Sequence, residues 1–461
     1  MSTLLVRHAA LVATFDDQRR ELPDAGLFVR DGFIEQVGIA AELPEEADEI
    51  LDLRGHIVIP GLVNTHHHFY QTLTRAVPSA QNANLFNWLL ALYPIWARLT
   101  PQDIAISTQT ALAELALSGC TTAADHLYIF PNGARLDDEI EAADAIGLRL
   151  QAARGSMSVG ESEGGLPPDS VVEPEEQILA DSQRLIERYH DAKPGAMTQI
   201  VLAPCSPFSV SQNLMRETAR LARQQQVYLH THLAETQDEE HYIRDHFGQR
   251  PVAWLQTLDW LGEDVWFAHS VHINDEEIAQ YARLGCGVAH CPTSNMRLAS
   301  GIAPIAKMLT AGIKVGLGVD GSASNDSSHL LAEARQAMLL ARLDAGLRSA
   351  SLSEGETPAL MGARQALELA TRGGAAVLGR RDIGSLERGK CADFFAVDLG
   401  QLDYAGALHD PLAALVFCAP VRVDYTVVAG RFVVKEGRLL TLDLPAHIEK
   451  HNRAARRLLE G

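Results

Sequence analysis

The 461-residue sequence predicts an α/β fold, namely a (β/α)8 TIM-type barrel with a small β-sandwich domain built from both chain termini. Apolar strand-like runs alternate with helical stretches from residue 61 to residue 374, which is typical of a parallel barrel. Four of these runs end in His, Glu or Asp, and a parallel barrel gathers its functional side chains at the C-terminal ends of its strands. Short strands and turns at both ends of the chain predict the second, smaller unit.

Residues 1–60 and 375–461 are expected to supply the two parts of the sandwich, the second part with a terminal helix. An Asp31-Gly32 turn separates two apolar runs within residues 26–37, which indicates a hairpin. Strand-like runs also cover residues 392–397, 421–428 and 431–438, the last two joined by Ala429-Gly430. Neither end is large enough to make a good core alone, so we expect the two to pack together.

The barrel is expected to span residues 61–374, and the apolar run over residues 57–59 reads as the strand that leads into it. Thr100 is suited to cap a helix that has Pro101 at its first position. The run over residues 121–126 reads as the next strand of the barrel.

Three histidines, His66, His67 and His68, follow the first of these strands. Side chains two residues apart in a strand point to the same face, so His66 and His68 can face one point while His67 faces away. Two neutral imidazoles on one rigid element make a good half-site for zinc. A histidine triplet can also be a solvated turn, so the rest of the chain has to supply the other ligands.

Three later apolar runs end in the same kinds of side chain. Residues 227–233 contain His232 and precede Glu235, residues 265–269 end in His269, and residues 313–319 precede Asp320. Because strand ends meet at one mouth of a parallel barrel, we expect these groups to lie together.

The chain resembles the amidohydrolase superfamily, in its aminohydrolase (deaminase) branch. The resemblance covers nearly the whole chain and rests on Pro60-Gly61 before His66-x-His68, on His232-x-x-Glu235, on His269, and on Gly318-Val319-Asp320-Gly321 followed by Ser322. It implies the same barrel with a sandwich from both termini. It also implies a metal-dependent hydrolase that deaminates an aromatic nitrogen heterocycle.

His66, His68, His232 and Asp320 are the four candidate ligands for one divalent metal ion, and three imidazoles with one carboxylate suit Zn²⁺ or Fe²⁺. Metal-activated hydroxide would attack the substrate carbon, with Asp320 as the base. Glu235 is expected to protonate the adjacent ring nitrogen, although a carboxylate here could also be a surface residue at a helix start. His269 would polarise the attacking water, with nearby His272 as the alternative.

One metal is expected because two-metal members of the superfamily bridge their ions with a modified lysine on the fourth barrel strand. The corresponding residues 199–208 contain no lysine, and Cys205 lies near their end. This absence also argues against the hydantoinase and dihydroorotase type of ring hydrolase. A lone cysteine on an apolar strand is more often a small buried residue than a ligand.

Gln71 and Cys205 are the candidate substrate-binding residues. The amide of Gln71 offers both a donor and an acceptor, which suits the edge of a purine. The segment around Trp88 could supply a stacking surface or could simply be buried core. Residues 64–75, 164–170 and 204–210 most resemble bacterial 8-oxoguanine deaminases, which convert 8-oxoguanine and water to urate and ammonia. Isoxanthopterin, isocytosine, guanine and hydroxylated s-triazines are the alternative substrates.

A formal net charge of −20 argues against nucleic acid and against an anionic membrane surface as partners. We find no apolar run long enough to cross a bilayer and no signal peptide, and six scattered cysteines suit reduced thiols in a cytoplasmic enzyme. A small heterocycle is the expected partner, and a homo-oligomer is expected because large barrels often associate. The Gly- and Pro-rich residues 161–170 form either a cover over the site or a passive loop.

Overall fold

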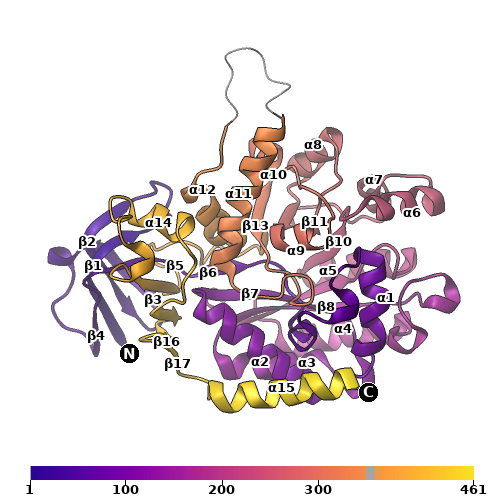
Figure 1. The fold of residues 1–461 in the computed structure, drawn as a ribbon, viewed down its shortest axis with the longest axis horizontal. Coiled ribbons are helices and arrows are strands. Elements are labelled where there is room, and N and C mark those ends of the chain that lie inside the picture. The colour runs from indigo at the N-terminus through magenta and orange to yellow at the C-terminus, as the bar shows by residue number, and fades with distance from the viewer. Residues whose placement is uncertain (1, 349–358, 461) are drawn as a thin grey trace.

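The computed structural model describes residues 2–348 and 359–460 and confirms the barrel (Figure 1). Eight strands close in the order β10-β11-β12-β13-β6-β7-β8-β9, and all neighbouring pairs are parallel. The strands are β6 (Leu62–Asn64), β7 (Cys120–Leu127), β8 (Arg149–Ser156), β9 (Thr198–Pro204), β10 (Tyr228–Leu233), β11 (Val265–His269), β12 (Gly287–His290) and β13 (Lys314–Leu317).

Helices lie around and beside the barrel, and those that precede β13 in the chain link its strands (Figure 1). They are α1 (Leu85–Trp96), α2 (Pro101–Leu117), α3 (Leu136–Ile146), α4 (Glu175–Tyr189), α5 (Gln212–Gln225), α6 (Gln237–Phe247), α7 (Pro251–Gln256), α8 (Asp275–Leu284), α9 (Pro292–Arg297), α10 (Ile305–Thr310), α11 (Leu330–Arg348), α12 (Ala363–Glu368), α13 (Gly374–Val377), α14 (Pro411–Phe417) and α15 (Leu444–Glu460). The predicted cap of α2 is confirmed, because Thr100 and Asp103 form a reciprocal capping box. The C-terminal helix α15 packs along α2.

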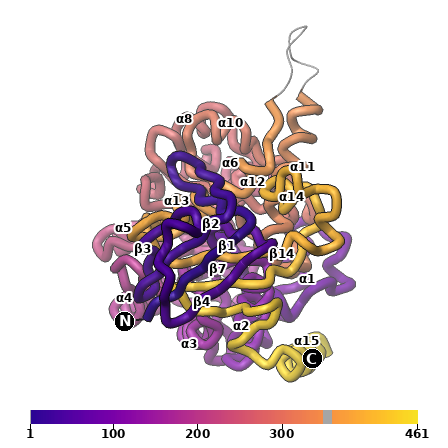
Figure 2. Tube along the Cα trace, turned by 90° about the vertical axis from the view of Figure 1, so that its left-hand side faces the viewer, coloured from indigo at the N-terminus to yellow at the C-terminus, as the bar shows by residue number. Residues whose placement is uncertain are grey.

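Strands from both chain ends form one nine-stranded sheet beside the barrel (Figure 2). Its order is β17-β16-β15-β14-β5-β1-β2-β3, with β4 paired to β1. The strands are β1 (Thr3–Ala13), β2 (Glu21–Arg30), β3 (Phe33–Ile39), β4 (Glu49–Asp52), β5 (His56–Pro60), β14 (Phe394–Asp398), β15 (Tyr425–Val428), β16 (Arg431–Lys435) and β17 (Arg438–Leu439). The sheet has its own cluster of buried apolar side chains, so the two chain ends do share a core.

Both predicted hairpins of this sheet are confirmed. Asp31 (φ 49°) and Gly32 (φ 84°) turn β2 into β3, and Ala429 (φ 48°) and Gly430 (φ 74°) turn β15 into β16. Two consecutive left-handed residues match the right-handed twist of the flanking strands. The domain boundaries after residues 60 and 374 stay predictions, as does the homo-oligomer. In the part of the chain that the structure describes, no helix is both long and apolar enough to cross a membrane.

One expected strand belongs elsewhere. The apolar run at residues 57–59 lies in β5, which pairs with β1 and β14 of the outer sheet and not with the barrel. The chain crosses into the barrel at Gly61, where a Cβ atom would lie only 2.1 Å from Oγ1 of Thr121. The barrel strand itself, β6, is three residues long and ends before the histidines. The strand-alternation argument for His66 and His68 is therefore wrong, because both residues follow the strand.

The interior of the barrel is packed below the mouth that carries the histidines. Small side chains, including Ala124, Ala153 and Ala203, pack there with Trp266 and with residues of α13. α13 contacts β6, β12 and β13 and closes this part of the barrel. Because this part of the interior is packed, room for a ligand remains at the mouth that carries the histidines, as in other parallel barrels.

A buried ion pair joins the barrel to the outer sheet. Arg149 of β8 and Asp393, which precedes β14, are bound through two contacts, Nε to Oδ2 at 2.6 Å and Nη2 to Oδ1 at 3.0 Å. Neither side chain is more than 2% exposed. Nη1 of Arg149 also donates to the backbone oxygen of Gly195 at 2.6 Å. The guanidinium is therefore well paired only while Asp393 is ionised.

Replacing Asp393 with asparagine is expected to destabilise the protein by about 3–5 kcal/mol, because it leaves the Arg149 charge buried and unpaired. Chemical denaturation of the wild type and of Asp393→Asn measures the difference. The exposed carboxylate Asp403 provides the control, and Asp403→Asn should change the unfolding free energy by less than about 0.5 kcal/mol. A loss below about 1 kcal/mol for Asp393→Asn would contradict this account of the ion pair.

Candidate metal and active site

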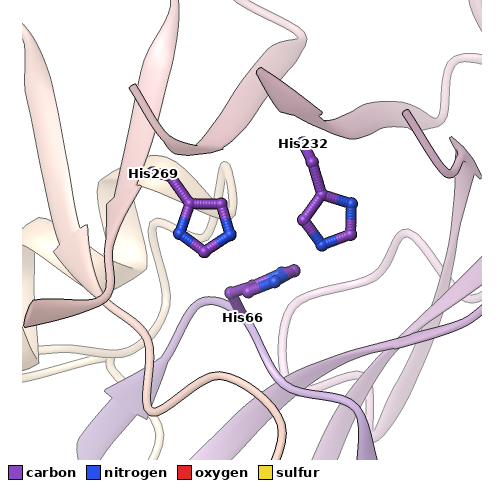
Figure 3. A group of neighbouring side chains, drawn as sticks. All are labelled: His66, His232 and His269. Carbon is purple, nitrogen blue, oxygen red and sulfur yellow. The ribbon is translucent and has the colours of Figure 1, made fainter. Parts of the chain in front are cut away.

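Histidines from three strand ends meet at one mouth of the barrel (Figure 3). His66 follows β6, His232 lies in β10 and His269 ends β11. Their ring centroids are 4.9–5.6 Å apart, and His68 lies 4.7 Å from His66 by the same measure. Asp320 follows β13, and its backbone N–H donates to the oxygen of His66 at 3.1 Å. The structure thus brings together all the predicted metal ligands and His269.

The hydrogen bonds of His68 and His232 leave a lone pair on each ring facing the other. Nδ1 of His68 lies 2.7 Å from the backbone oxygen of His126, and Nδ1 of His232 lies 2.7 Å from that of Cys205. A carbonyl only accepts, so both Nδ1 atoms carry hydrogen, and burial lowers the pKa of both rings, that of His232 to about 3. The two unprotonated Nε2 atoms are nevertheless only 3.1 Å apart, which favours a cation between them.

Two further donor atoms complete the group. Nε2 of His66 is buried without a hydrogen-bond partner in the described chain, and it lies 3.4 Å from Oδ1 of Asp320. Nε2 of His68 lies at the same distance from that oxygen. Ligand atoms bonded to zinc at about 2.0–2.1 Å in a tetrahedron are about 3.3 Å apart. The spacing and the chemistry of these four donors therefore fit a divalent metal ion.

Asp320 is held as a carboxylate. Burial alone would raise its pKa, but the interaction with His66 and the nearby His269 and His68 hold this pKa well below its usual range. Its backbone is left-handed at φ 62°, and His269 has φ 71°. Such conformations are costly for residues other than glycine and often occur where function requires one side-chain direction.

Glu235 and His269 face each other beside the proposed ligands. Oε2 of Glu235 lies 3.6 Å from Nε2 of His269, which is also 3.9 Å from Oδ2 of Asp320. Burial raises the pKa of Glu235, which favours a protonated carboxyl group. Burial alone would lower the pKa of His269, but the charges of Glu235 and Asp320 raise it above its usual value.

Three residues that sequence reasoning missed hold these two side chains. Asn295 binds Nδ1 of His269 through Oδ1 at 3.0 Å, and Ser300 donates from Oγ to Oε1 of Glu235 at 3.3 Å. The carboxylate of Glu239 accepts from the backbone nitrogens of Ala234 and Glu235 at 2.6 and 3.0 Å. Asn295 lies in α9, directly after barrel strand β12, whereas Glu239 carries only the signal of a helix start three residues after Thr236.

The structure separates the two candidate histidines after β11. His269 lines the cavity at the barrel mouth, whereas Nε2 of His272 lies 2.7 Å from the backbone oxygen of Ser300 and the residue is not in the cavity lining. Residues 161–170, all described, do not line this cavity either. They form two short 3₁₀ turns, and Glu161 N–H donates to the oxygen of Pro167 at 2.9 Å.

The cavity has a volume of about 480 Å³ including its open mouth. Gln71, Cys205 and Trp88 line it, together with His68, Leu85, Leu89, Tyr93, Tyr128, Ser206, Phe208, His232, Glu235, Glu239, His269, Leu298, Asp320 and Ser324. The cavity thus has aromatic and aliphatic walls and a group of polar side chains. This arrangement suits a flat ring that has polar atoms at its edge.

Gln71 and Cys205 differ in what they present to this cavity. The side-chain oxygen of Gln71 accepts from Ala323 N–H at 3.4 Å, while its buried nitrogen has no hydrogen-bond partner in the described chain. Burial raises the pKa of Cys205 to about 12, so its thiol is neutral. Among the described residues, no cluster of metal-binding atoms includes this sulfur.

Comparison with known proteins agrees with the fold and identifies the family. The Amidohydrolase family profile matches residues 57–433. An 8-oxoguanine deaminase of Pseudomonas aeruginosa is 50% identical over 439 residues, 95% of each chain, and a hydroxydechloroatrazine ethylaminohydrolase of Pseudomonas sp. (strain ADP) is 38% identical over 96% of this chain and 93% of that protein. Atrazine chlorohydrolase from Arthrobacter aurescens TC1, solved in complex with zinc, superposes with a TM-score of 0.92 at 34% identity, over 98% of this chain and all of that one. The chain belongs to the amidohydrolase family.

Proposed function

We propose that this protein is a metal-dependent deaminase of an aromatic nitrogen heterocycle, with 8-oxoguanine as its substrate and urate and ammonia as its products. The observation that carries the proposal is the convergence of four metal-type donors with Glu235 and His269 at a cavity for a flat ring. The choice of 8-oxoguanine is supported by 50% identity to an 8-oxoguanine deaminase over 95% of both chains.

In this proposal His66, His68, His232 and Asp320 hold one divalent ion, zinc or iron. When bound there, such an ion would lower the pKa of a water molecule toward neutrality and so supply the nucleophile. Asp320 takes up the proton that the water loses, because it lines the cavity and its second oxygen, Oδ2, lies 3.9 Å from Nε2 of His269. Its depressed pKa keeps it ionised before the reaction, so that its oxygens are free of protons.

Glu235 delivers a proton to the ring nitrogen next to the carbon under attack. Its raised pKa favours the protonated form before the reaction, and Ser300 fixes one of its oxygens. Transfer of this proton removes the negative charge that develops on the ring as the carbon becomes tetrahedral. The proton held by Asp320 then passes to the amino group, which leaves as ammonia. The proton of the newly added hydroxyl passes to Glu235, which leaves a carbonyl on the ring and restores Glu235 to its starting form.

His269 orients the attacking water and stabilises the oxygen that becomes the new carbonyl. With Nδ1 bound to Asn295, its Nε2 points between Glu235 and Asp320. The negative charge of Asp320, 3.9 Å from Nε2, favours a hydrogen on that nitrogen, which can be donated to that oxygen.

Gln71 reads the polar edge of the substrate. Its unpaired amide nitrogen can donate to a ring carbonyl of the substrate. A substrate that lacks this carbonyl would leave the buried donor unpaired and would therefore bind more weakly. Cys205 and Trp88 contribute a neutral thiol and an aromatic face to the walls.

The second candidate is hydrolysis of a hydroxylated s-triazine, which is favoured by the hydroxydechloroatrazine ethylaminohydrolase relative. It uses the same site but releases an alkylamine. We expect metal-loaded protein to release ammonia from 8-oxoguanine with a higher kcat/KM than from guanine, isoxanthopterin, isocytosine or a hydroxylated amino-triazine. Coupled ammonia detection, with chromatography for alkylamines, measures this. A preferred triazine substrate, or alkylamine as the faster product, would contradict the choice of 8-oxoguanine.

Glu235→Gln is expected to retain the metal and lose about 10²–10⁴-fold in kcat, because only proton delivery is removed. Steady-state kinetics and metal analysis of the same sample test this. Glu276→Gln, which changes an exposed carboxylate in the first turn of α8, should behave like the wild type. Activity of Glu235→Gln within about threefold of the wild type would overturn the role of Glu235.

His232→Ala is expected to lose metal and activity together, since a deprotonated imidazole is removed from the proposed ligand set. Metal content by elemental analysis is the measurement. His290→Ala is a matched control, because His290 also lies at the end of a barrel strand but lines a separate pocket between the barrel and α10 and α11. Full metal content in His232→Ala would contradict the ligand assignment.

A further inference from the structure

His230 is buried beneath the proposed metal ligands and has no role in the proposed reaction. It lies in β10, two residues before His232, and is 1% exposed. Its Nε2 atom is 2.8 Å from Nδ1 of His66, and its own Nδ1 is 3.0 Å from the backbone oxygen of Trp266. The ring stacks on the Trp266 indole, with centroids 4.6 Å apart and an interplanar angle of 18°.

These contacts determine where the hydrogens of both rings lie. The oxygen of Trp266 can only accept, so Nδ1 of His230 carries a hydrogen. Among the described residues no carboxylate pairs with His230, and a buried charge without a partner is costly, so the ring is neutral and its Nε2 is an acceptor. The hydrogen between the two rings therefore belongs to Nδ1 of His66. It follows that Nε2 of His66, which faces Asp320, carries a free lone pair.

This arrangement differs from that of the other two proposed histidine ligands. Nδ1 of His68 and of His232 donate to backbone oxygens, which no substitution removes. His66 alone of the three depends on another side chain for its tautomer. The tautomer of His66 therefore depends on a side chain, that of His230, which can be replaced by mutation.

Trp266 supports the same ligand a second time. Its indole Nε1 donates to the backbone oxygen of Thr65 at 3.2 Å, directly before His66 in the chain. The indole of Trp266 therefore holds the backbone just before His66. Its carbonyl holds the ring of His66 through His230. A fully buried tryptophan on a barrel strand is a rigid base for both contacts.

A second metal ion among His66, His126 and His230 is the competing interpretation of this cluster, because one ring nitrogen of each lies close to the others. The 2.8 Å between His66 and His230 is a hydrogen-bond distance and is shorter than the spacing of about 3.3 Å expected for two nitrogens on one tetrahedral zinc. The contact is therefore a hydrogen bond.

We propose that His230 is a positioning residue that accepts the Nδ1 hydrogen of His66 and so fixes the tautomer in which His66 can bind the metal. The inference rests on the proposed function, because it takes His66 as a ligand. Partners of this kind typically change metal affinity 10–100-fold when they are removed.

The test is the zinc affinity of the full-length metal-free protein, measured by competition with a chromophoric chelator. His230→Leu is expected to bind zinc about 10–100-fold more weakly than the wild type. His230→Gln keeps an acceptor near the position of Nε2 and is expected to bind more tightly than His230→Leu. His290→Leu, the same change at a buried histidine outside the cluster, should bind like the wild type.

Zinc affinity of His230→Leu within about threefold of the wild type would overturn the proposal, because a typical positioning contact contributes more. Equal losses in His230→Leu and His230→Gln would also overturn it, since they would indicate packing and not acceptance of the His66 hydrogen. Failure of the wild type to bind zinc would instead contradict the proposed function, as would full zinc affinity in His232→Ala.

A measurement on the unmodified protein covers the case in which a variant does not fold. Two-bond ¹H–¹⁵N correlation spectra of histidine-labelled metal-free protein report the tautomer of each ring. His66 and His230 are both expected to carry hydrogen on Nδ1 and none on Nε2. A hydrogen on Nε2 of His230 would overturn the proposal whether or not zinc binds.

Discussion

The feature on which the rest of the site depends is the burial of several electron-rich atoms at one barrel mouth. The Nε2 atoms of His68 and His232 lie 3.1 Å apart, and the Nδ1 hydrogens of both rings are bonded to backbone carbonyls. The ionised Asp320 lies 3.4 Å from two of the histidines. Lone pairs and a carboxylate repel one another in a medium of low polarity, so this arrangement needs a cation, and the barrel must hold the donors in place against their repulsion.

The scaffold meets that requirement through the backbone. Carbonyls near the end of β7, within β11 and just after β9 bind the Nδ1 atoms of His68, His230 and His232. The backbone N–H of Asp320 donates to the backbone oxygen of His66. Below them the barrel is filled by small side chains and Trp266. The outer sheet is joined to β8 through Arg149 and Asp393, so strands from both chain ends stabilise the barrel that carries the donors.

Much of this was predictable because strand ends and hydrophobic runs are local signals. The runs ending at His269 and near His232 and Asp320 are the strands β11, β10 and β13, as expected. The prediction that residues 57–59 form a barrel strand was wrong, since an apolar run does not reveal which sheet it joins. Asn295, Ser300 and His230 escaped notice because their partners are distant in sequence, and a buried hydrogen bond leaves no periodic pattern.

Anomalous scattering from a zinc-loaded crystal tests the central claim most directly. The account predicts one zinc peak at the barrel mouth, bonded at about 2.0–2.2 Å to the Nε2 atoms of three histidines and to one oxygen of Asp320. Those histidines are His66, His68 and His232. Two peaks at the mouth, a peak between the rings of His66, His126 and His230, or zinc bound through the sulfur of Cys205 would contradict it.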